Sequence, residues 1–239
     1  MKTLNIVSIV KSDLKSITKT AQSINTAQLP NDFYVRHLVC IGDNSFGLDE
    51  QLNLLQCRNL EIVSTQDSGL YNAMNIGLSH IEHGWVMFLN GGDELATTDS
   101  LIHISNAITK SNCDLVQLQT QIGQKISPVR MYSKFNLFLG REMHAHPSFL
   151  FNFDKLKGLR FDEKYEVVAD YKFVLEAMRF SNVSFEPIVV VKFELGGLSS
   201  RNLKRLVSES NKVRIDLSAG ILLPLVILWN LKVRLFSRL

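Results

Sequence analysis

The chain has 239 residues, of which 46% are hydrophobic and 21% are charged, a balance that is typical of a folded globular protein and excludes a disordered one. Its net charge of +3 is unevenly distributed, because segment 201–239 carries eight basic and two acidic residues and leaves a net −3 on residues 1–200. A nucleic-acid-binding domain would be basic over its main body, so the composition argues against nucleic acid as a partner.

Three cysteines, Cys40, Cys57 and Cys113, are widely spaced and form no C-x-x-C pair. This arrangement predicts neither a disulfide framework nor a zinc site and favours a reducing compartment. The first apolar run, Leu4–Val10, has only the length of a strand and is followed at once by charged residues, so no signal peptide is predicted. We therefore expect a cytoplasmic protein.

Strands and helices are predicted to alternate along the first half of the chain. Apolar runs that end at turn-forming residues indicate strands, and apolar residues at helical spacing indicate helices. The alternation predicts an α/β fold with a mostly parallel central sheet flanked by helices. The expected strands are 4–10, 34–41, 61–64, 85–89 and 114–119, and the expected helices are 14–24, 48–55, 71–81 and 100–109.

The second half of the chain is less regular. Residues 123–142 have weak periodicity and are expected to form a loop-rich substrate region. A helix is predicted over 167–180, and a strand over 183–193 that Pro187 interrupts. We expect a single domain over 1–200.

The C-terminal segment 201–239 is expected to be a separate, amphipathic helical extension. Its part Ala219–Trp229 is almost wholly apolar, and basic residues then alternate with Leu and Phe. Eleven apolar residues cannot cross a bilayer, which needs about 20. A basic, apolar segment suits the surface of an anionic membrane, and the alternative is a helix packed on the domain or on a partner subunit.

Acidic residues follow the ends of two predicted strands, where ligands of parallel sheets bind. Asp43 could accept hydrogen bonds from a uracil-like base or from ribose hydroxyls, or it could cap the next helix. In Asn90-Gly91-Gly92-Asp93, the glycines would allow close approach to a phosphate, and Asp93 would suit a Mg²⁺ or Mn²⁺ ion beside a diphosphate. The alternative for Asp93 is an N-cap in a loop turn.

A third acidic residue, Asp170, interrupts an apolar run at the start of the predicted helix 167–180. It is either the N-cap of that helix or a general base in a partly buried position. His144 and His146 lack a third ligand at a recognisable spacing, so zinc is not predicted.

The order of these motifs resembles the inverting family 2 glycosyltransferases of GT-A fold. The resemblance covers roughly residues 3–202. Within that family, the chain resembles bacterial enzymes of exopolysaccharide, O-antigen and colanic-acid assembly. It rests on D-S-G-L-Y-N-A-M-N-I-G at 67–77, F-L-N-G-G-D at 88–93, H-P-S-F at 146–149, A-D-Y at 169–171 and G-G-L-S at 196–199.

The resemblance implies a role for each matched residue. Asp93 would be the metal-coordinating carboxylate and Asp170 the general base on the acceptor hydroxyl. His146, Gly197 and Ser199 would lie near the acceptor or the diphosphate. The residues implied to bind the nucleotide-sugar are Ser8, Val10, Asp43, Asp67, Asn75, Gly92 and Asp93.

Four positions depart from the family pattern. Gly42 and Asn72 stand where acids are usual, Asn90 replaces the first acid of the D-x-D motif, and Pro147 stands where a glutamine is common. These departures bear on ribose contacts, on nucleotide choice and on the acceptor.

The implied reaction moves a sugar from a UDP-, GDP- or dTDP-linked donor to a saccharide or polyprenyl-linked acceptor in cell-surface polysaccharide assembly. A Mg²⁺ or Mn²⁺ ion at Asp93 would offset charge on the leaving diphosphate, and Asp170 would accept the proton of the attacking hydroxyl. The tail would hold the enzyme at the inner face of the cytoplasmic membrane, as a peripheral protein.

Two other functions remain open. A sugar-nucleotide-forming enzyme should have a glycine-rich phosphate loop after the first strand, but Lys11-Ser12-Asp13-Leu14 contains no glycine. A non-catalytic nucleotide-sugar-binding subunit would keep the fold without the chemistry. The presence of both Asp93 and Asp170 argues against it, while Gly42 and Asn72 leave it possible.

Overall fold

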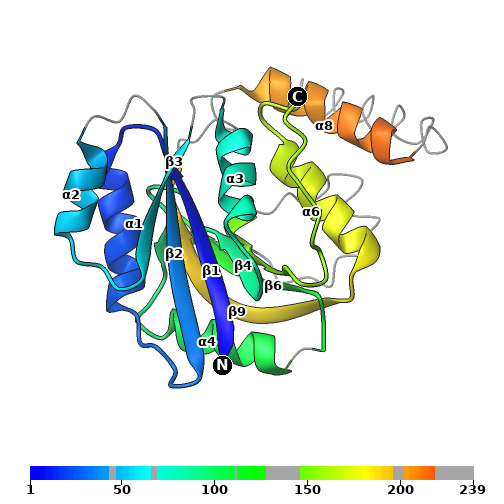
Figure 1. The fold of residues 1–239 in the computed structure, drawn as a ribbon. Helices are drawn as coiled ribbons and strands as arrows, with labels where there is room; N and C mark the ends of the chain where they lie inside the picture. Colours follow the sequence, from blue (N-terminus) through cyan, green and yellow to red (C-terminus); the bar gives the residue numbers. More distant parts are fainter. Residues whose placement is uncertain (43–46, 66–68, 111, 128–145, 196–201, 219–239) are drawn as a thin grey trace.

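The computed structural model describes residues 1–239 except 43–46, 66–68, 111, 128–145, 196–201 and 219–239 (Figure 1). Within this described part, nine strands form one sheet in the order β3-β2-β1-β4-β8-β6-β9-β5, with β7 paired to β6. The strands are β1 (Lys2–Val10), β2 (Phe33–Gly42), β3 (Leu60–Thr65), β4 (Trp85–Phe88), β5 (Glu94–Leu95), β6 (Leu115–Ile122), β7 (Lys125–Ile126), β8 (Phe149–Asn152) and β9 (Val183–Phe193).

Helices cover both faces of this sheet. Apolar residues of α3 and α6 pack on one face, and those of α1 and α4 on the other, so the central strands are buried on both sides. The helices are α1 (Leu14–Thr26), α2 (Leu48–Leu54), α3 (Leu70–Ser79), α4 (Ser100–Lys110), α6 (Ala169–Phe180) and α8 (Leu203–Ser218), with a short 3₁₀ helix η1 (His146–Ser148).

The predicted α/β architecture is confirmed. β1, β2, β3 and β4 run parallel, so the carboxyl ends of these strands lie at one edge of the sheet. Each predicted strand and helix is present, with ends that differ by a few residues. The sheet is mixed because β8 runs antiparallel between β4 and β6.

Two features of the sheet differ from the sequence prediction. β8 was not predicted, because four residues after Pro147 are too short to show a period. β9 is not interrupted at Pro187, which is exposed and lies in a shift of register between Phe185 and Val189. The residue without an N–H therefore falls where the ladder is already irregular, as expected for proline.

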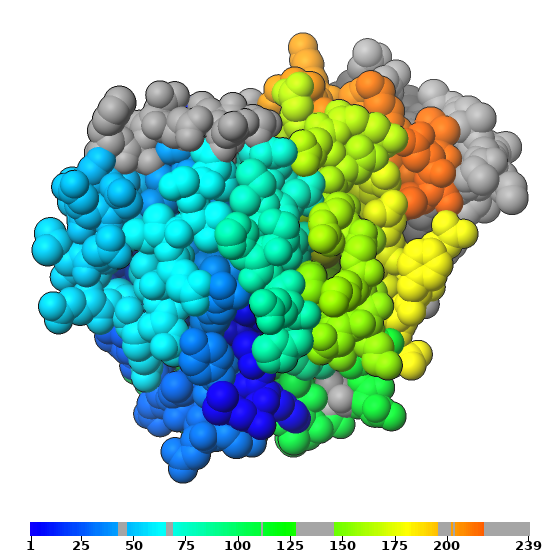
Figure 2. Space-filling model, in the orientation of Figure 1, coloured from blue at the N-terminus to red at the C-terminus, as the bar shows by residue number. Residues whose placement is uncertain are grey.

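Helix α8, the first part of the predicted extension, packs on the domain. Val213 is completely buried in the same core cluster as α3 and α6. The Glu209 carboxylate accepts a hydrogen bond from the main-chain N–H of Val167 at 2.9 Å, and Tyr165 donates its hydroxyl to Asp216 at 2.6 Å. Figure 2 shows α8, in orange, seated against the yellow-green part of the chain that contains α6.

The predicted membrane-associated stretch 219–239 lies outside the described residues. No helix in the part of the chain that is described has the length and apolar character needed to span a bilayer.

Candidate functional site

The Asn90–Asp93 loop continues the pairing of β4 beyond its last residue. The N–H of Gly91 donates to the carbonyl of Ile9 at 3.3 Å, so the loop follows β1 to the edge of the sheet. The N–H of Gly92 donates to Thr20 Oγ1 at 3.0 Å, and Thr20 donates in turn to the carbonyl of Asp93 at 2.7 Å. Helix α1 therefore fixes this loop through the hydrogen bonds of Thr20.

Glycine is required at position 92 for two separate reasons. The backbone has a φ of +101°, which side chains of L residues rarely adopt. A Cβ atom at this position would lie 1.7 Å from Oε2 of Glu194, the residue that follows β9. The loop is therefore in close contact with the end of β9.

The Asp93 carboxylate lies inside this junction. Only 4% of the residue is exposed, and Oδ1 accepts the main-chain N–H of Glu194 at 2.9 Å. Burial raises the pKa of Asp93 to about 6, and the nearby Glu194 carboxylate acts in the same direction. Strand β5 follows Asp93 directly, so the predicted alternative of a helix N-cap is wrong.

Asp170 lies in the first turn of α6, whose N-cap is Val168. The predicted alternative that Asp170 is the N-cap is therefore wrong. The Asp170 side chain is 28% exposed, and its Oδ1 accepts the N–H of Tyr171 at 2.8 Å. A carboxylate in the first turn is stabilised by the helix dipole.

Two side chains from other elements contact the Asp170 carboxylate. The hydroxyl of Tyr71, in α3, donates to Oδ1 at 3.2 Å. Nδ1 of His146, in η1, lies 3.5 Å from Oδ2. Burial, together with the charge of Asp170, raises the pKa of the Tyr71 phenol well above its usual range, so the phenol remains a hydrogen-bond donor.

His146 connects the two acidic residues. Its Nδ1 is 3.5 Å from Asp170, and an electrostatic contribution from His146 partly opposes the burial that raises the pKa of Asp93. Among the described residues, Nε2 of His146 and Oδ1 of Asn90 are buried without a hydrogen-bond partner. Five other buried side-chain atoms of the described residues also lack a partner, on Gln117, Thr120, Asn152, Ser181 and Ser210. The atoms of His146 and Asn90 are the two that belong to the segments around Asp170 and Asp93, where a ligand would supply the missing contacts.

The site offers oxygen ligands for a divalent cation. In the described residues, no three or more His, Cys, Asp or Glu side chains form a metal-binding group. Asp93 and Asn90 provide a carboxylate and an unpaired amide oxygen. This donor set fits Mg²⁺ or Mn²⁺ ions that take most of their remaining ligands from substrate phosphates and water.

Several sequence-predicted site residues have structural roles in the described interior. Ser8 is completely buried, donates its hydroxyl to the carbonyl of Leu89 and lies 2.8 Å from Nε2 of His37. Val10 is buried in a cluster with residues of α1 and α2. The side chains of Ser8 and Val10 therefore pack within the interior of the fold.

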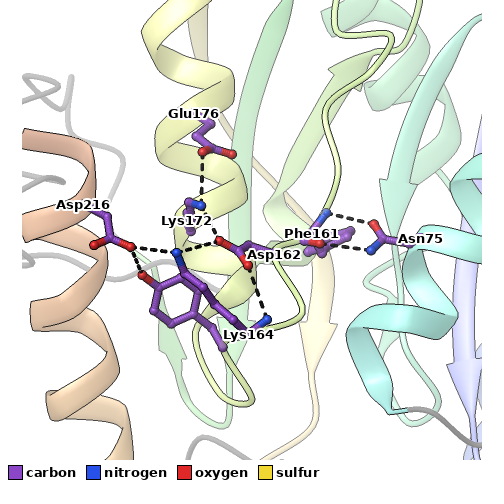
Figure 3. A network of polar contacts seen from close by, with 8 residues as sticks. Asn75, Phe161, Asp162, Lys164, Lys172, Glu176 and Asp216 are labelled. Carbon is purple, nitrogen blue, oxygen red and sulfur yellow. Dashed lines mark hydrogen bonds and ion pairs between the residues drawn. The ribbon is translucent and has the colours of Figure 1, made fainter. Parts of the chain in front are cut away.

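Asn75 connects α3 to the segment that leads into α6 (Figure 3). Its amide accepts the N–H of Phe161 at 2.8 Å and donates to the carbonyl of Phe161 at 3.0 Å. It also donates to Glu163 at 2.7 Å. Asn75 thus fixes the segment that precedes Asp170. Asp162, which Figure 3 draws in the same set of polar contacts, belongs to this segment and lies eight residues before Asp170.

Four predicted site residues, Asp43, Asp67, Gly197 and Ser199, lie outside the described residues. Two residues that the sequence did not single out, Tyr71 and Glu194, contact the site. Tyr71 lies within the segment 67–77 that matches the family pattern. It is 99 positions from Asp170 in the chain, so no local sequence pattern predicts their contact.

The chain is similar to known proteins in sequence and in fold. No family model matches the chain. A search of curated proteins finds 26% identity over 200 residues with a teichoic acid poly(glycerol phosphate) polymerase of Staphylococcus epidermidis. This match covers 76% of the chain but only 27% of the relative, so the chain spans about a quarter of that protein.

Solved structures of glycosyltransferases have the same fold. The crystal structure of S. aureus TarS 1-349 has a TM-score of 0.69 at 16% identity, covering 90% of this chain and 66% of that one. The mannosyltransferase PcManGT from Pyrobaculum calidifontis, in complex with GDP-Man and Mn²⁺, has a TM-score of 0.66 at 13% identity, with coverages of 88% and 62%. The chain therefore has the GT-A fold.

Proposed function

We propose that this chain is an inverting glycosyltransferase of cell-surface glycan assembly that uses a nucleoside-diphosphate sugar. The observation that carries the proposal is the pair of acidic residues, Asp93 and Asp170, that both interact with His146 at the carboxyl edge of a GT-A sheet. A buried carboxylate for a cation and a partly exposed one for a proton are the two groups that sugar transfer needs.

The relatives support the donor and the cation. TarS has been solved with UDP-GlcNAc, with a TM-score of 0.68 to this chain, and PcManGT with GDP-Man and Mn²⁺. Oδ1 of Asn90, which is buried without a hydrogen-bond partner in the loop that carries Asp93, is suited to the same ligands. We infer that the chain binds a UDP-, GDP- or dTDP-linked sugar together with Mg²⁺ or Mn²⁺.

Each residue of the site has a distinct role in the proposal. Asp93 and Asn90 hold the cation, which stabilises charge on the departing diphosphate when it is bound. Asp170 accepts the proton of the acceptor hydroxyl, while Tyr71 and His146 fix the direction of its carboxylate. Attack by the acceptor opposite to the leaving group inverts the anomeric carbon and requires no covalent intermediate.

The acceptor proposed here is a saccharide or a polyprenyl-linked saccharide. The S. epidermidis relative is named for a polymer of glycerol phosphate, which supports an acceptor that belongs to the cell envelope and carries phosphate. We further infer that residues 219–239, apolar and then basic, hold the protein at the inner face of the cytoplasmic membrane, where such acceptors lie.

The first test is thermal stabilisation of the purified chain by UDP, GDP, dTDP and CMP, each with and without Mn²⁺. A ligand that binds only the folded state raises the melting temperature by mass action. We expect one nucleoside diphosphate to stabilise the protein only when Mn²⁺ is present, and the effect to vanish in Asp93→Ala. If no nucleotide stabilises the protein under any of these conditions, the proposed donor site is wrong.

The second test addresses the chemical step. Asp170→Asn is expected to abolish sugar transfer but to keep the Mn²⁺-dependent thermal shift, because the base does not contact the nucleotide. Asp99→Asn, an exposed aspartate next to α4, serves as the control and is expected to retain activity. Near-native turnover by Asp170→Asn would remove the base assignment. Nucleotide binding without transfer by the wild-type chain would indicate a non-catalytic binding subunit.

A further inference from the structure

A groove of about 730 Å³ lies between α8 and the segment 164–165 that precedes α6. We call it the α8 groove. Lys164 and Tyr165 line it on one side, and Lys204, Arg205, Ser208 and Lys212 line it on the α8 side, together with Asn202, Glu209 and Asp216. Four of its lining side chains are basic and two are acidic, so the groove carries a net positive charge.

The two carboxylates of the groove are occupied by the structure itself. Asp216 accepts hydrogen bonds from Lys164 at 2.8 Å and from Tyr165 at 2.6 Å, and these bonds hold the pKa of Asp216 below its usual value. Figure 3 shows how Lys164 lies between Asp216 and Asp162, so this lysine is also committed.

Glu209 is satisfied in the same way. Its carboxylate accepts the main-chain N–H of Val167 at 2.9 Å and the guanidinium of Arg205 at 2.8 Å. Burial alone would raise the pKa of Glu209, but these hydrogen bonds hold that pKa below its usual value. Arg205 also pairs with Glu166. The acids of the groove therefore have fixed hydrogen-bond partners, but Lys164 and Arg205 are each shared with a second acid outside the groove, Asp162 and Glu166. The free positive charge of the groove accordingly comes from its remaining lysines.

Two lysines of the groove have no such commitment. Lys204 and Lys212 are exposed and, among the described residues, have no acidic partner. They stand with Ser208 at positions i, i+4 and i+8 of α8, so all three project from one face of the helix. Eight residues of helix span roughly 12 Å, which spaces two ammonium groups and a hydroxyl along an extended ligand.

The α8 groove is joined to the candidate active site through the same segment. Tyr165 lines the groove, and five residues later the chain reaches Asp170 at the start of α6. Nε of Arg214, in α8, donates to the hydroxyl of Tyr171, the neighbour of Asp170, at 3.4 Å. The residues 165–171 thus connect the groove to the helix that carries the proposed base.

We propose that the α8 groove binds phosphate groups of the acceptor, with Lys204, Ser208 and Lys212 as the recognition residues. This assignment rests on the proposed glycosyltransferase function for the identity of the ligand. Ammonium groups bind phosphate as point charges, and their spacing along α8 selects an acceptor with phosphates distributed along its length. An uncharged saccharide offers no negative charge with which these lysines could pair.

The groove is tested by isothermal titration of the full chain with inorganic tripolyphosphate in metal-free buffer. We expect the wild type to bind, and the double variant Lys204→Gln/Lys212→Gln to bind at least about ten-fold more weakly, because two charge-assisted contacts are lost. The matched control Lys110→Gln/Lys155→Gln removes the same charge from exposed lysines in α4 and after β8, and should bind as the wild type does. Equal affinity in both double variants would overturn the proposal.

Two further measurements separate the possible sources of failure. Sedimentation with phosphatidylglycerol-containing vesicles tests a lipid surface: if Lys204 and Lys212 are needed for vesicles but not for tripolyphosphate, the acceptor assignment is wrong. The Mn²⁺-dependent thermal shift by nucleotides, repeated in both double variants, should be unchanged. Lysine-dependent binding of tripolyphosphate without any nucleotide response would keep the phosphate site and reject the glycosyltransferase.

Discussion

The hydroxyl of Tyr71 lies 3.2 Å from Oδ1 of Asp170, although 99 residues separate them in the chain. Tyr71 lies in the first turn of α3 and Asp170 in the first turn of α6, so the contact joins the starts of two helices that pack on the same face of the sheet. Because Tyr71 is buried and remains protonated, its hydroxyl can only donate to this carboxylate. We infer that Tyr71 is a positioning residue for the proposed base.

Tyr71→Phe removes this donor without removing the ring. A hydrogen bond to a charged group contributes roughly 1.5–3 kcal/mol, so we expect kcat to fall about 10- to 100-fold. The KM for the nucleotide-sugar should not change. Tyr34→Phe, in β2, is the control. An unchanged kcat in Tyr71→Phe, or a fall in kcat matched by an equal change in KM, would contradict the role.

Gly92→Ala should destabilise the protein and disturb the Asp93 loop, because the added Cβ would lie 1.7 Å from Glu194 Oε2. The positive φ adds strain, of order 1–3 kcal/mol. Gly158→Ala is a matched control, since Gly158 has a φ of +109° but no atom within 4 Å of an added Cβ. In urea unfolding, Gly92→Ala should cost more than Gly158→Ala. Equal costs would mean that the contact with Glu194 has no effect on stability.

Asp93→Asn should make the protein more stable at pH 8 but not at pH 4. Burial raises the pKa of Asp93 to about 6, so the native state holds its proton more tightly than the unfolded state. The penalty of the buried charge is thus small at pH 4, close to the ordinary pKa of 3.8, and complete above pH 6, where it reaches at most about 3 kcal/mol. Urea unfolding of both proteins at the two pH values measures it.

The same substitution should abolish the Mn²⁺-dependent nucleotide shift, since the amide carries no charge for the cation. Asp99→Asn, which changes an exposed aspartate, should show neither effect. A stability gain of Asp93→Asn that is equal at pH 4 and pH 8 would contradict the assignment of the raised pKa to Asp93.

Ser8→Ala should reduce stability and leave nucleotide affinity unchanged. The Ser8 hydroxyl gives its proton to the carbonyl of Leu89, so it must accept from Nε2 of His37. Removing it leaves both buried groups unpaired, at a cost of about 1–3 kcal/mol each at most. Chemical denaturation and nucleotide titration measure the two quantities, with Ser79→Ala as an exposed control. A loss of nucleotide affinity at equal stability would instead support the sequence-based role of Ser8 in binding the base.

The sequence alone determined the alternation of strands and helices, because buried strands and amphipathic helices leave periodic apolar patterns that act over a few residues. It also identified Asp93 and Asp170, since a lone carboxylate beside glycines or within an apolar run is locally conspicuous. It could not predict β8, whose four residues depend on the neighbouring strands β4 and β6 for their partners. The continuous β9 likewise depends on a register shift opposite Pro187.

Only the tertiary structure decided which of these residues meet. The contacts of Asp170 with Tyr71 and His146, and of Asp93 with Glu194, join segments between 24 and 101 positions apart in the chain. Ser8 and Asn75 match the same motif pattern as the site residues, but their side chains are used within the fold. Periodicity records which face of an element is buried, whereas the partner of a polar side chain depends on how distant elements pack, and no local pattern contains that information.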